Sequence, residues 1–404
     1  MAYPNMQLSN KVAKIPEALS IYINQLVYDQ QRRGKDITVL SLGEAFFNIP
    51  MFDFNELDFA RCYHYSDSRG IPELRDKISC FYKKHYAAEI DPAHELIISA
   101  GSKPIIYFCM LACLNAGDEV LIHEPGWLSY QEQAVMADAI PTFIPHHVAV
   151  GDFSDFFTEK TKMLVINNPN NPAGRQYSME ELTLIYQQCR PKGIYVLVDE
   201  AYSDFTDAFH SMAEVVPDKD GIIIVNSLSK NMGMSGWRVG YAISSPCVID
   251  QVLKLNQHLI TCAPTLLQHY MAQFFDDITQ TTLPQVRATV EKRARIARYL
   301  DKLGLNRMPG DSTFYFMVGL ADFPGTGLEF AIHLLLRHQI AVVPGIAYGK
   351  SCERYIRVGI GSESEERICM ALSVIRDLLF NPSYDYANSL SELTHQGFHL
   401  FAEK

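Results

Sequence analysis

The chemistry that this chain could perform centres on Lys230, which lies among serines and glycines and eight residues before a second cation, Arg238. The preceding residues 221–225 are apolar and mostly β-branched, which predicts a buried strand. Burial and a neighbouring positive charge both lower the pKa of a lysine. A neutral amine is what Schiff-base chemistry needs. The segment also fits a surface turn with an ordinary lysine, so the rest of the chain must decide between the two interpretations.

The elements that must position this lysine alternate between strands and helices from about residue 95. Helical segments separate most of the strand-like runs, and a capping box, Ser178 with Glu181, begins one of these helices. The alternation predicts an α/β fold with a large domain built on a mostly parallel, seven-stranded sheet that is flanked by helices. The predicted strands are 95–100, 119–124, 142–146, 163–167, 195–199, 221–225 and 239–244.

A second, smaller α/β domain is predicted from both chain ends. A long helical region from residue 266 to about 303 has no strong breaker after Pro284 and would link the two domains. We expect a large domain over residues 45–280 and a small domain from residues 1–44 and 281–404. The last twenty or so residues are polar and patternless, and they receive no assignment. The other expected elements are helices at 16–33, 327–338 and 363–379 and strands at 37–42, 313–318, 340–343 and 355–358.

Composition excludes several classes of function. The 404 residues carry 46 acidic and 35 basic side chains, a net charge of −11, which argues against a nucleic-acid or anionic-membrane binder. No apolar run is long enough to span a membrane, and residues 1–20 do not resemble a signal peptide. The nine cysteines and 13 histidines show no metal-ligand spacing, so we expect no metal. Unpaired cysteines fit a reducing compartment, and we expect a cytoplasmic protein.

Polar residues follow the predicted strands where each strand ends, and ligands of such sheets gather at the carboxyl ends of strands. Each residue has an ordinary explanation: Ser102 could cap a helix, Trp127 could belong to the core, and residues 168–172 could be a simple turn. Taken together, they predict one site that combines an anion cradle, an aromatic ring, an amide, an acid and an amine. These strand-end residues are Gly101, Ser102, Lys103, Trp127, Asn167 to Asn171, Asp199, Tyr202, Ser227, Lys230 and Arg238.

In this order, the motifs resemble those of the fold-type I pyridoxal-phosphate enzymes, and specifically the class I and II aminotransferase family. The resemblance extends from about residue 35 to residue 380. It rests on Tyr65 five residues before Gly70, Gly101-Ser-Lys, Pro125-Gly-Trp, Asn168-Pro-Asn-Asn-Pro-Ala-Gly, Asp199-Glu-Ala-Tyr, Ser227-Leu-Ser-Lys, Arg238 and Tyr355-Ile-Arg.

The resemblance implies that Lys230 binds pyridoxal 5'-phosphate through a Schiff base and then moves the substrate proton. Asp199 would face the ring nitrogen, Tyr202 and Asn171 the ring phenolate oxygen, and Trp127 the ring face. The phosphate would lie against Ser102, Ser227, Arg238 and the amides after Gly101. The cofactor-binding set is then Ser102, Lys103, Trp127, Asn171, Asp199, Tyr202, Ser227, Lys230, Arg238 and Tyr65.

For the substrate, the resemblance implies that Arg357 clamps the α-carboxylate, assisted by Asn171 and the Gly43 backbone. A surface strand arginine is the alternative for Arg357. The counterpart of Tyr65 in the family reaches the phosphate of a neighbouring subunit, which implies a homodimer with shared active sites. Lys103 gives a weak hint of an acidic substrate, whereas the unusual Gly43-Glu-Ala-Phe-Phe sequence could make the side-chain pocket more apolar.

The sequence therefore predicts an aminotransferase that moves an amino group between an amino acid and a 2-oxo acid by a ping-pong mechanism. A β-lyase, or another pyridoxal-phosphate reaction through the same carbanion, is the nearest alternative, because the same residues prepare both. A non-catalytic binding regulator is a remote alternative. A nicotinamide-dependent dehydrogenase is set aside, because no Gly-x-Gly-x-x-Gly follows the first strand of the alternating region.

Overall fold

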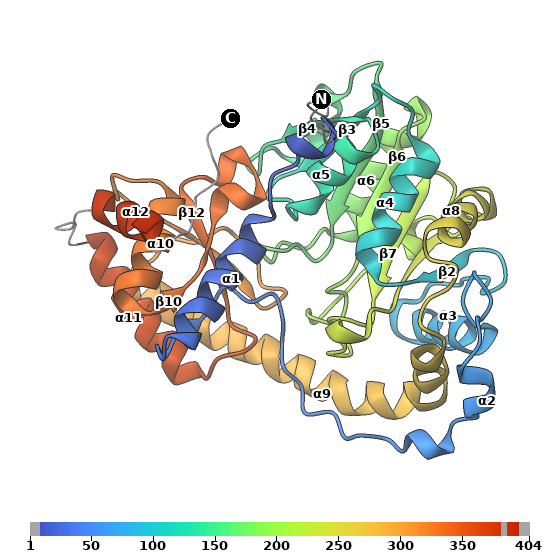
Figure 1. The fold of residues 1–404 in the computed structure, drawn as a ribbon. Coiled ribbons are helices and arrows are strands. Elements are labelled where there is room, and N and C mark those ends of the chain that lie inside the picture. Colours follow the sequence, from blue (N-terminus) through green and yellow to red (C-terminus); the bar gives the residue numbers. More distant parts are fainter. Residues whose placement is uncertain (1–8, 381–385, 396–404) are drawn as a thin grey trace, which may run out of the picture.

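A seven-stranded sheet forms the larger part of the protein in the computed structural model, which describes residues 9–380 and 386–395 (Figure 1). The strand order is β2-β8-β7-β6-β5-β3-β4. β8 runs antiparallel to both of its neighbours, and all other pairs are parallel. The mostly parallel sheet that the sequence predicts is thus confirmed. The strands are β2 (Leu96–Ser99), β3 (Glu119–His123), β4 (Ile140–Ile144), β5 (Thr161–Asn167), β6 (Tyr195–Asp199), β7 (Ile222–Ser227) and β8 (Gly240–Ser244).

Helices cover both faces of this sheet, which explains why its strands are continuously apolar rather than alternating. Leu164 and Ile166 pack on one face, with α3, α6 and the start of α9. Val165, between them in β5, packs on the other face with α4, α5 and α8. The helices of this part are α2 (Phe59–Cys62), α3 (Pro72–Tyr86), α4 (Ser102–Cys113), α5 (Ser129–Met136), α6 (Met179–Cys189), α7 (Met212–Val215) and α8 (Pro246–Leu259).

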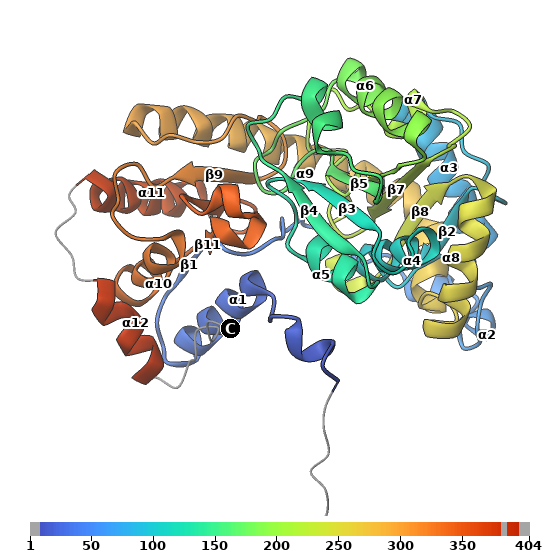
Figure 2. The same ribbon diagram turned by 90° about the horizontal axis from the view of Figure 1, so that it is seen from above.

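A smaller α/β part is assembled from both ends of the described chain (Figures 1 and 2). An antiparallel sheet, in the order β11-β12-β9, lies in its core, and a parallel pair joins β1 to β10. The elements are α1 (Leu19–Arg32), β1 (Thr38–Val39), β9 (Tyr315–Gly319), α10 (Gly327–His338), β10 (Ile340–Ala341), β11 (Val343–Pro344), β12 (Tyr355–Gly359), α11 (Glu365–Phe380) and α12 (Tyr386–His395).

One long helix, α9 (Thr265–Leu303), runs through both parts and is drawn in gold in Figure 1. Its first half packs Tyr270 and Phe274 against the large sheet. Its second half packs Ile296 and Leu300 in the core of the smaller part. The backbone of α9 departs from helical φ and ψ angles at Phe274, and the helix continues through Pro284. The predicted linking helix is confirmed. Among the described residues, no helix is both long and apolar enough to cross a membrane.

Several predicted elements differ from the structure. The strand expected at 37–42 shortens to the two-residue β1, and the strand expected at 142–146 is β4, two residues earlier. The run 340–343 splits into β10 and β11, because each pairs with a different strand.

The polar tail, which received no assignment, contains α12. Packing against the rest of the small part accounts for this helix, since Leu393 is fully buried beside α1 and α10, and His333 Nδ1 lies 3.0 Å from Ser389 Oγ. The expectations for residues 381–385 and 396–404 lie outside the described residues.

Candidate active site

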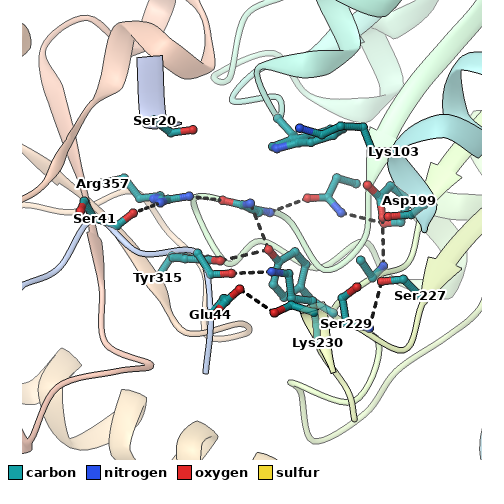
Figure 3. A pocket seen from close by; sticks show the side chains of 18 of the residues that line it. Ser20, Ser41, Glu44, Lys103, Asp199, Ser227, Ser229, Lys230, Tyr315 and Arg357 are labelled. Atoms are coloured by element: carbon teal, nitrogen blue, oxygen red, sulfur yellow. Dashed lines mark hydrogen bonds between the residues drawn. The ribbon is translucent and has the colours of Figure 1, made fainter. Parts of the chain in front are cut away.

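A cavity of about 390 Å³ opens at the carboxyl ends of the parallel strands, between the large sheet and the smaller part (Figure 3). The structure brings eleven of the twelve sequence-predicted site residues together in its wall. Tyr65 does not line it; its side chain lies on a loop and is 85% exposed. The eleven are Gly43, Ser102, Lys103, Trp127, Asn171, Asp199, Tyr202, Ser227, Lys230, Arg238 and Arg357.

Lys230 lies three residues beyond the end of β7, with its amine inside the cavity. The Nζ group donates a hydrogen bond to the Gly43 carbonyl. Burial, together with Arg357 and Arg238, lowers the pKa of Lys230 to about 8, while the carboxylates of Glu44 and Asp199 oppose the shift. Roughly a tenth of an amine with this pKa is neutral at pH 7, as a nucleophile or proton acceptor must be. The direction of the pKa shift agrees with the sequence-based prediction, and an amine that lines a cavity does not fit an ordinary surface turn.

Asp199 ends β6 and is almost completely buried. Its Oδ2 accepts a hydrogen bond from the Tyr130 hydroxyl at 2.6 Å, and its Oδ1 accepts one from the Ala201 amide at 3.0 Å. Burial raises the pKa of Asp199, while the two hydrogen bonds act in the opposite direction. No ion pair within 4.0 Å engages this carboxylate in the described chain. It is thus suited to a ligand group that carries a proton or a positive charge.

An anion cradle lies where β2 passes into α4. Gly101 has a φ of +94°, and a Cβ at this position would lie 2.3 Å from Nη2 of Arg238. Glycine therefore allows the guanidinium to approach the start of α4. No side chain caps this helix, so the amides of its first turn remain available. Free amides and a guanidinium at a helix N-terminus suit a phosphate.

Arg357 projects from β12 into the cavity and is 4% exposed, so the alternative of a surface arginine is wrong. Its Nη2 donates to the Ser41 carbonyl at 2.6 Å and its Nη1 to Asn171 Oδ1 at 3.3 Å. The guanidinium lies 4.5 Å from the Tyr315 ring centre and 5.2 Å from that of Tyr348. Its Nε has no partner in the described part of the chain. These contacts fix the plane of a group that binds carboxylates through two parallel hydrogen bonds.

A hydrogen-bonded chain of side chains connects this arginine to the floor of the site. Asn171 Nδ2 donates to the Tyr202 hydroxyl at 3.1 Å, and the Tyr202 and Tyr315 hydroxyls lie 3.0 Å apart. Burial raises the pKa of Tyr202 well above its usual value, so its hydroxyl keeps its proton and can donate it to a ligand oxygen. On the opposite wall, the Lys103 amine lies 5.1 Å from the Trp127 ring centre.

Sequence reasoning missed several residues of the site and its surroundings, among them Glu44, Tyr130, Tyr315, Ser20 and Glu124. Glu44 accepts a hydrogen bond from Ser235 Oγ at 2.6 Å and faces the cavity. Tyr130 positions Asp199, and Tyr315 contacts both Tyr202 and Arg357. Ser20, on α1, lies across the cavity from Lys103 in Figure 3. Of these, only Tyr130, three residues after Trp127, carries a local signal; Glu44, Ser20 and Tyr315 reach the site through tertiary packing.

Another of these missed residues, Glu124, fastens the small part to the large sheet. It is 3% exposed, and its carboxylate accepts hydrogen bonds from the amides of Lys350 at 2.9 Å and Ser351 at 3.2 Å. Two residues on, the Gly126 amide donates to the Tyr348 carbonyl at 2.9 Å. These bonds hold the 345–352 loop, whose Tyr348 ring packs on the Arg357 guanidinium. We call this set of contacts the Glu124 joint.

Comparisons with known proteins agree with this geometry. The family described as aminotransferase class I and II matches residues 27–375. A (5-formylfuran-3-yl)methyl phosphate transaminase from Methanocaldococcus jannaschii is 32% identical over 356 residues, which is 86% of this chain and 93% of that protein. An aspartate aminotransferase from Thermotoga maritima is 29% identical over 383 residues, covering 92% of this chain and 99% of that protein.

Solved structures show the same fold. A Methanococcus jannaschii protein, described as similar in its active site to kynurenine aminotransferases, superposes with a TM-score of 0.82. It is 30% identical, and the match covers 92% of this chain and all of that one. In the described part of this chain, no group of three or more metal-ligating side chains occurs. This chain belongs to the class I and II aminotransferase family, whose members are pyridoxal-phosphate-dependent transaminases.

Proposed function

We propose that the cavity around Lys230 is the transamination site, in which an amino acid and a 2-oxo acid bind alternately. The observation that carries the proposal is an inward-facing, half-buried amine with a pKa of about 8 that shares one cavity with a buried, hydrogen-bonded arginine. The Lys230 amine would take the proton from the substrate α-carbon and return it during the transfer. Arg357 would bind the α-carboxylate and so fix which substituent of that carbon faces the amine.

Three features of the cavity fit pyridoxal phosphate. The Asp199 carboxylate has no cation partner within 4.0 Å in the described chain, and it suits a protonated ring nitrogen. The uncapped start of α4, with Arg238 beside it, suits the phosphate. The Tyr202 hydroxyl and the Asn171 amide suit the ring oxygen. When bound, the cofactor supplies an aldehyde for the amine and a ring that takes up the electron pair released at the α-carbon.

Each remaining residue then has a defined task. Trp127 would cover one face of the cofactor ring and exclude water from it. Ser102, Ser227 and Arg238 would hold the phosphate, with Lys103 adding positive charge beside it. Tyr130 would keep Asp199 oriented and ionised, because its hydroxyl hydrogen bond favours the carboxylate form. The Gly43 carbonyl and the Asn171 side chain would complete the substrate site.

A homodimer with shared sites is part of the proposal. Tyr65 is too exposed to serve the cavity of its own chain, and Met51 and Tyr63 in the same segment are 86% and 78% exposed. Large apolar side chains gathered on one exposed segment are typical of an interaction surface.

Mixing two inactive variants tests this directly. If Tyr65 serves the partner's site, combining Lys230→Ala chains with Tyr65→Ala chains creates one complete site per mixed dimer, and activity rises above the sum of the two. If Tyr65 serves its own chain, no complete site forms and activity does not rise. Light scattering on the purified protein checks the dimer mass.

We also propose two domains, at 45–280 and at 1–44 with 281–404. Separate cores support this division, because residues 57–278 pack with the large sheet and most of the second core comes from residues 286–379.

A cytoplasmic location is proposed as well, since all nine cysteines are unpaired and two of them, Cys80 and Cys247, are exposed. Fractionation of the native host, with the thiols counted in the purified protein, tests the location.

A rapid-mixing screen tests the proposed function. Each amino acid is mixed with the cofactor-loaded enzyme, and the absorbance of the bound cofactor is followed until it reaches the amine form; a 2-oxo acid should then reverse the change. Conversion by at least one amino acid and reversal by a 2-oxo acid are expected. Formation of pyruvate and ammonia without any 2-oxo acid would instead favour the β-lyase alternative. Lys230→Ala provides the control without proton transfer.

A further inference from the structure

A second cavity, of about 420 Å³, adjoins the cavity around Lys230 and shares Lys103 and Trp127 with it. We call it the side chamber. Residues 15–18 before α1, with Leu19 at its start, form one wall, α5 forms another, and residues 346–349 of the small part form a third. Figure 1 shows the segment before α1 running beside α5. Its volume falls within the range of roughly 300–1,000 Å³ that is typical of small-molecule pockets.

The walls of the side chamber are mainly apolar. Side chains from four separate segments of the chain contribute to them, and most are only half-buried, so a bound group would remove their exposed apolar surface from water. The apolar side chains are Ile15, Leu19, Ile122, Leu128, Met136, Phe143 and Ile346.

The charges at the side chamber disfavour an anionic side chain. Two carboxylates, Glu17 and Glu132, line it against one cation, Lys103. The Lys103 amine is placed over the Trp127 ring, and burial, helped by Arg238, lowers its pKa. A second carboxylate on the substrate would meet like charge at two points of the wall and would lose hydration among apolar groups.

We propose that the side chamber receives the substrate side chain and selects amino acids with a large apolar side chain, such as leucine or phenylalanine, over aspartate and glutamate. This inference rests on the proposed function. A substrate held by its carboxylate at Arg357 and by its amine at Lys230 can extend its side chain past Lys103 and Trp127 into this space. The proposal reverses the hint of an acidic substrate that Lys103 gives by itself.

The first experiment compares four substrates on the wild-type, cofactor-loaded enzyme. L-alanine, L-leucine, L-phenylalanine and L-aspartate are mixed with it in turn, and the rate of cofactor conversion is measured against concentration. Each buried methylene contributes roughly four-fold to binding, so leucine, with three more carbons than alanine, should exceed it by roughly 50-fold in kcat/KM. We expect aspartate to fall below leucine by at least about ten-fold.

Three variants test whether the selectivity lies in the side chamber. Ala347→Trp fills it from the small part, and the leucine-to-alanine ratio should fall by at least about ten-fold. Glu353→Trp places the same bulk just beyond the same loop, on an exposed residue that lines neither cavity, and this ratio should stay as in the wild type. Glu132→Gln removes one carboxylate from the wall, and the aspartate-to-leucine ratio should rise roughly three-fold.

The outcomes separate this inference from the proposed function. If aspartate or glutamate converts the cofactor faster than leucine, the side chamber does not select apolar side chains, although transamination stands. An unchanged leucine-to-alanine ratio in Ala347→Trp would also overturn the inference. If no amino acid converts the cofactor, the proposed function and the inference both fall.

Discussion

We predict that Glu124→Ala weakens amino-acid binding while leaving the environment of Lys230 unchanged. The carboxylate of Glu124 holds the amides of Lys350 and Ser351, and so fixes the loop that packs Tyr348 against Arg357, the proposed clamp for the substrate carboxylate. Lys230 belongs to the large-sheet side of this joint. Loss of the Glu124 carboxylate should therefore displace Arg357, the proposed substrate clamp, and leave the position of the Lys230 amine unchanged.

The size of the effect follows from the contacts. A hydrogen bond to a charged group contributes about 1.5–3 kcal/mol, so two such bonds set an upper limit of about 3–6 kcal/mol. Lys350 is exposed and Ser351 is half-buried, so water will form hydrogen bonds with their amides and replace part of the lost interaction energy. We expect about 2 kcal/mol to appear as weaker substrate binding, a rise in KM of roughly 30-fold.

Gly349 offers a matched perturbation from the other side of the joint. Its φ is +135°, and an added Cβ would lie 2.3 Å from Glu124 Oε1. Gly349→Ala should raise KM as well, with backbone strain of about 1–3 kcal/mol added to the clash. In the double variant Glu124→Ala/Gly349→Ala the clash disappears, so the two effects should sum to less than their separate values.

Steady-state kinetics with the best amino acid from the screen measure KM and kcat for each variant, and a pH titration of the cofactor absorbance reports on Lys230. Glu124→Gln, which keeps one acceptor oxygen, should fall between wild type and Glu124→Ala. A KM within two-fold of wild type in Glu124→Ala, or strict additivity in the double variant, would refute the reasoning. An altered cofactor titration would show that the joint does not act through the clamp alone.

Three further outcomes are expected. Lys230→Ala should abolish turnover without unfolding the protein; activity near the wild-type rate with an unchanged circular dichroism spectrum would contradict the proposed proton transfer. Arg357→Lys should raise KM for every amino acid by roughly 10–100-fold, because an ammonium cannot pair with both carboxylate oxygens in the plane that the guanidinium holds; unchanged half-saturation would remove this role. Cofactor capture by the cofactor-free protein should quicken as pH rises from 6 and level off above about 8, because only the neutral amine of Lys230 reacts and its pKa is about 8. At pH 7, roughly a tenth of a group with this pKa is neutral, against less than about a thousandth for an ordinary lysine; stopped-flow absorbance at several pH values checks the trend, and a rate independent of pH would contradict it.

The large sheet and most of its site could be predicted because both depend on local pattern. Apolar runs predict strands, and parallel strands place their carboxyl ends at one edge, so Asp199 and Lys230 had to lie close together once their strands were placed. Tyr315 and Glu124 could not be assigned in this way. One lies inside an apolar run and the other follows a strand as an ordinary acid, and their roles exist only through contacts with residues 113 and 226 positions away.

The smaller part shows the same limit in its architecture. The apolar run 340–343 predicts one strand, yet its two halves pair with partners in different sheets. The local sequence contains no turn residue that would predict this break. The helix α12 has a polar sequence and forms against a surface that α1 and α10 supply. In both cases tertiary packing overrides a weak local preference, which is expected where short segments contribute few apolar contacts of their own.

The charge of the site explains how an acidic chain can bind anions. The protein carries −11 overall, yet four cationic side chains, Lys103, Lys230, Arg238 and Arg357, line the cavity with only two carboxylates, Glu44 and Asp199. Placing four cations together is costly, and burial, with Arg357 and Arg238, lowers the pKa of Lys230 to about 8, so part of this amine is neutral near pH 7. The same repulsion favours a phosphate and a carboxylate as ligands, because each neutralises cations that the fold has already brought together. Burial first, and then the neighbouring arginines, lower the pKa of the amine that the reaction needs, and the same arginines give the cavity its affinity for anionic partners.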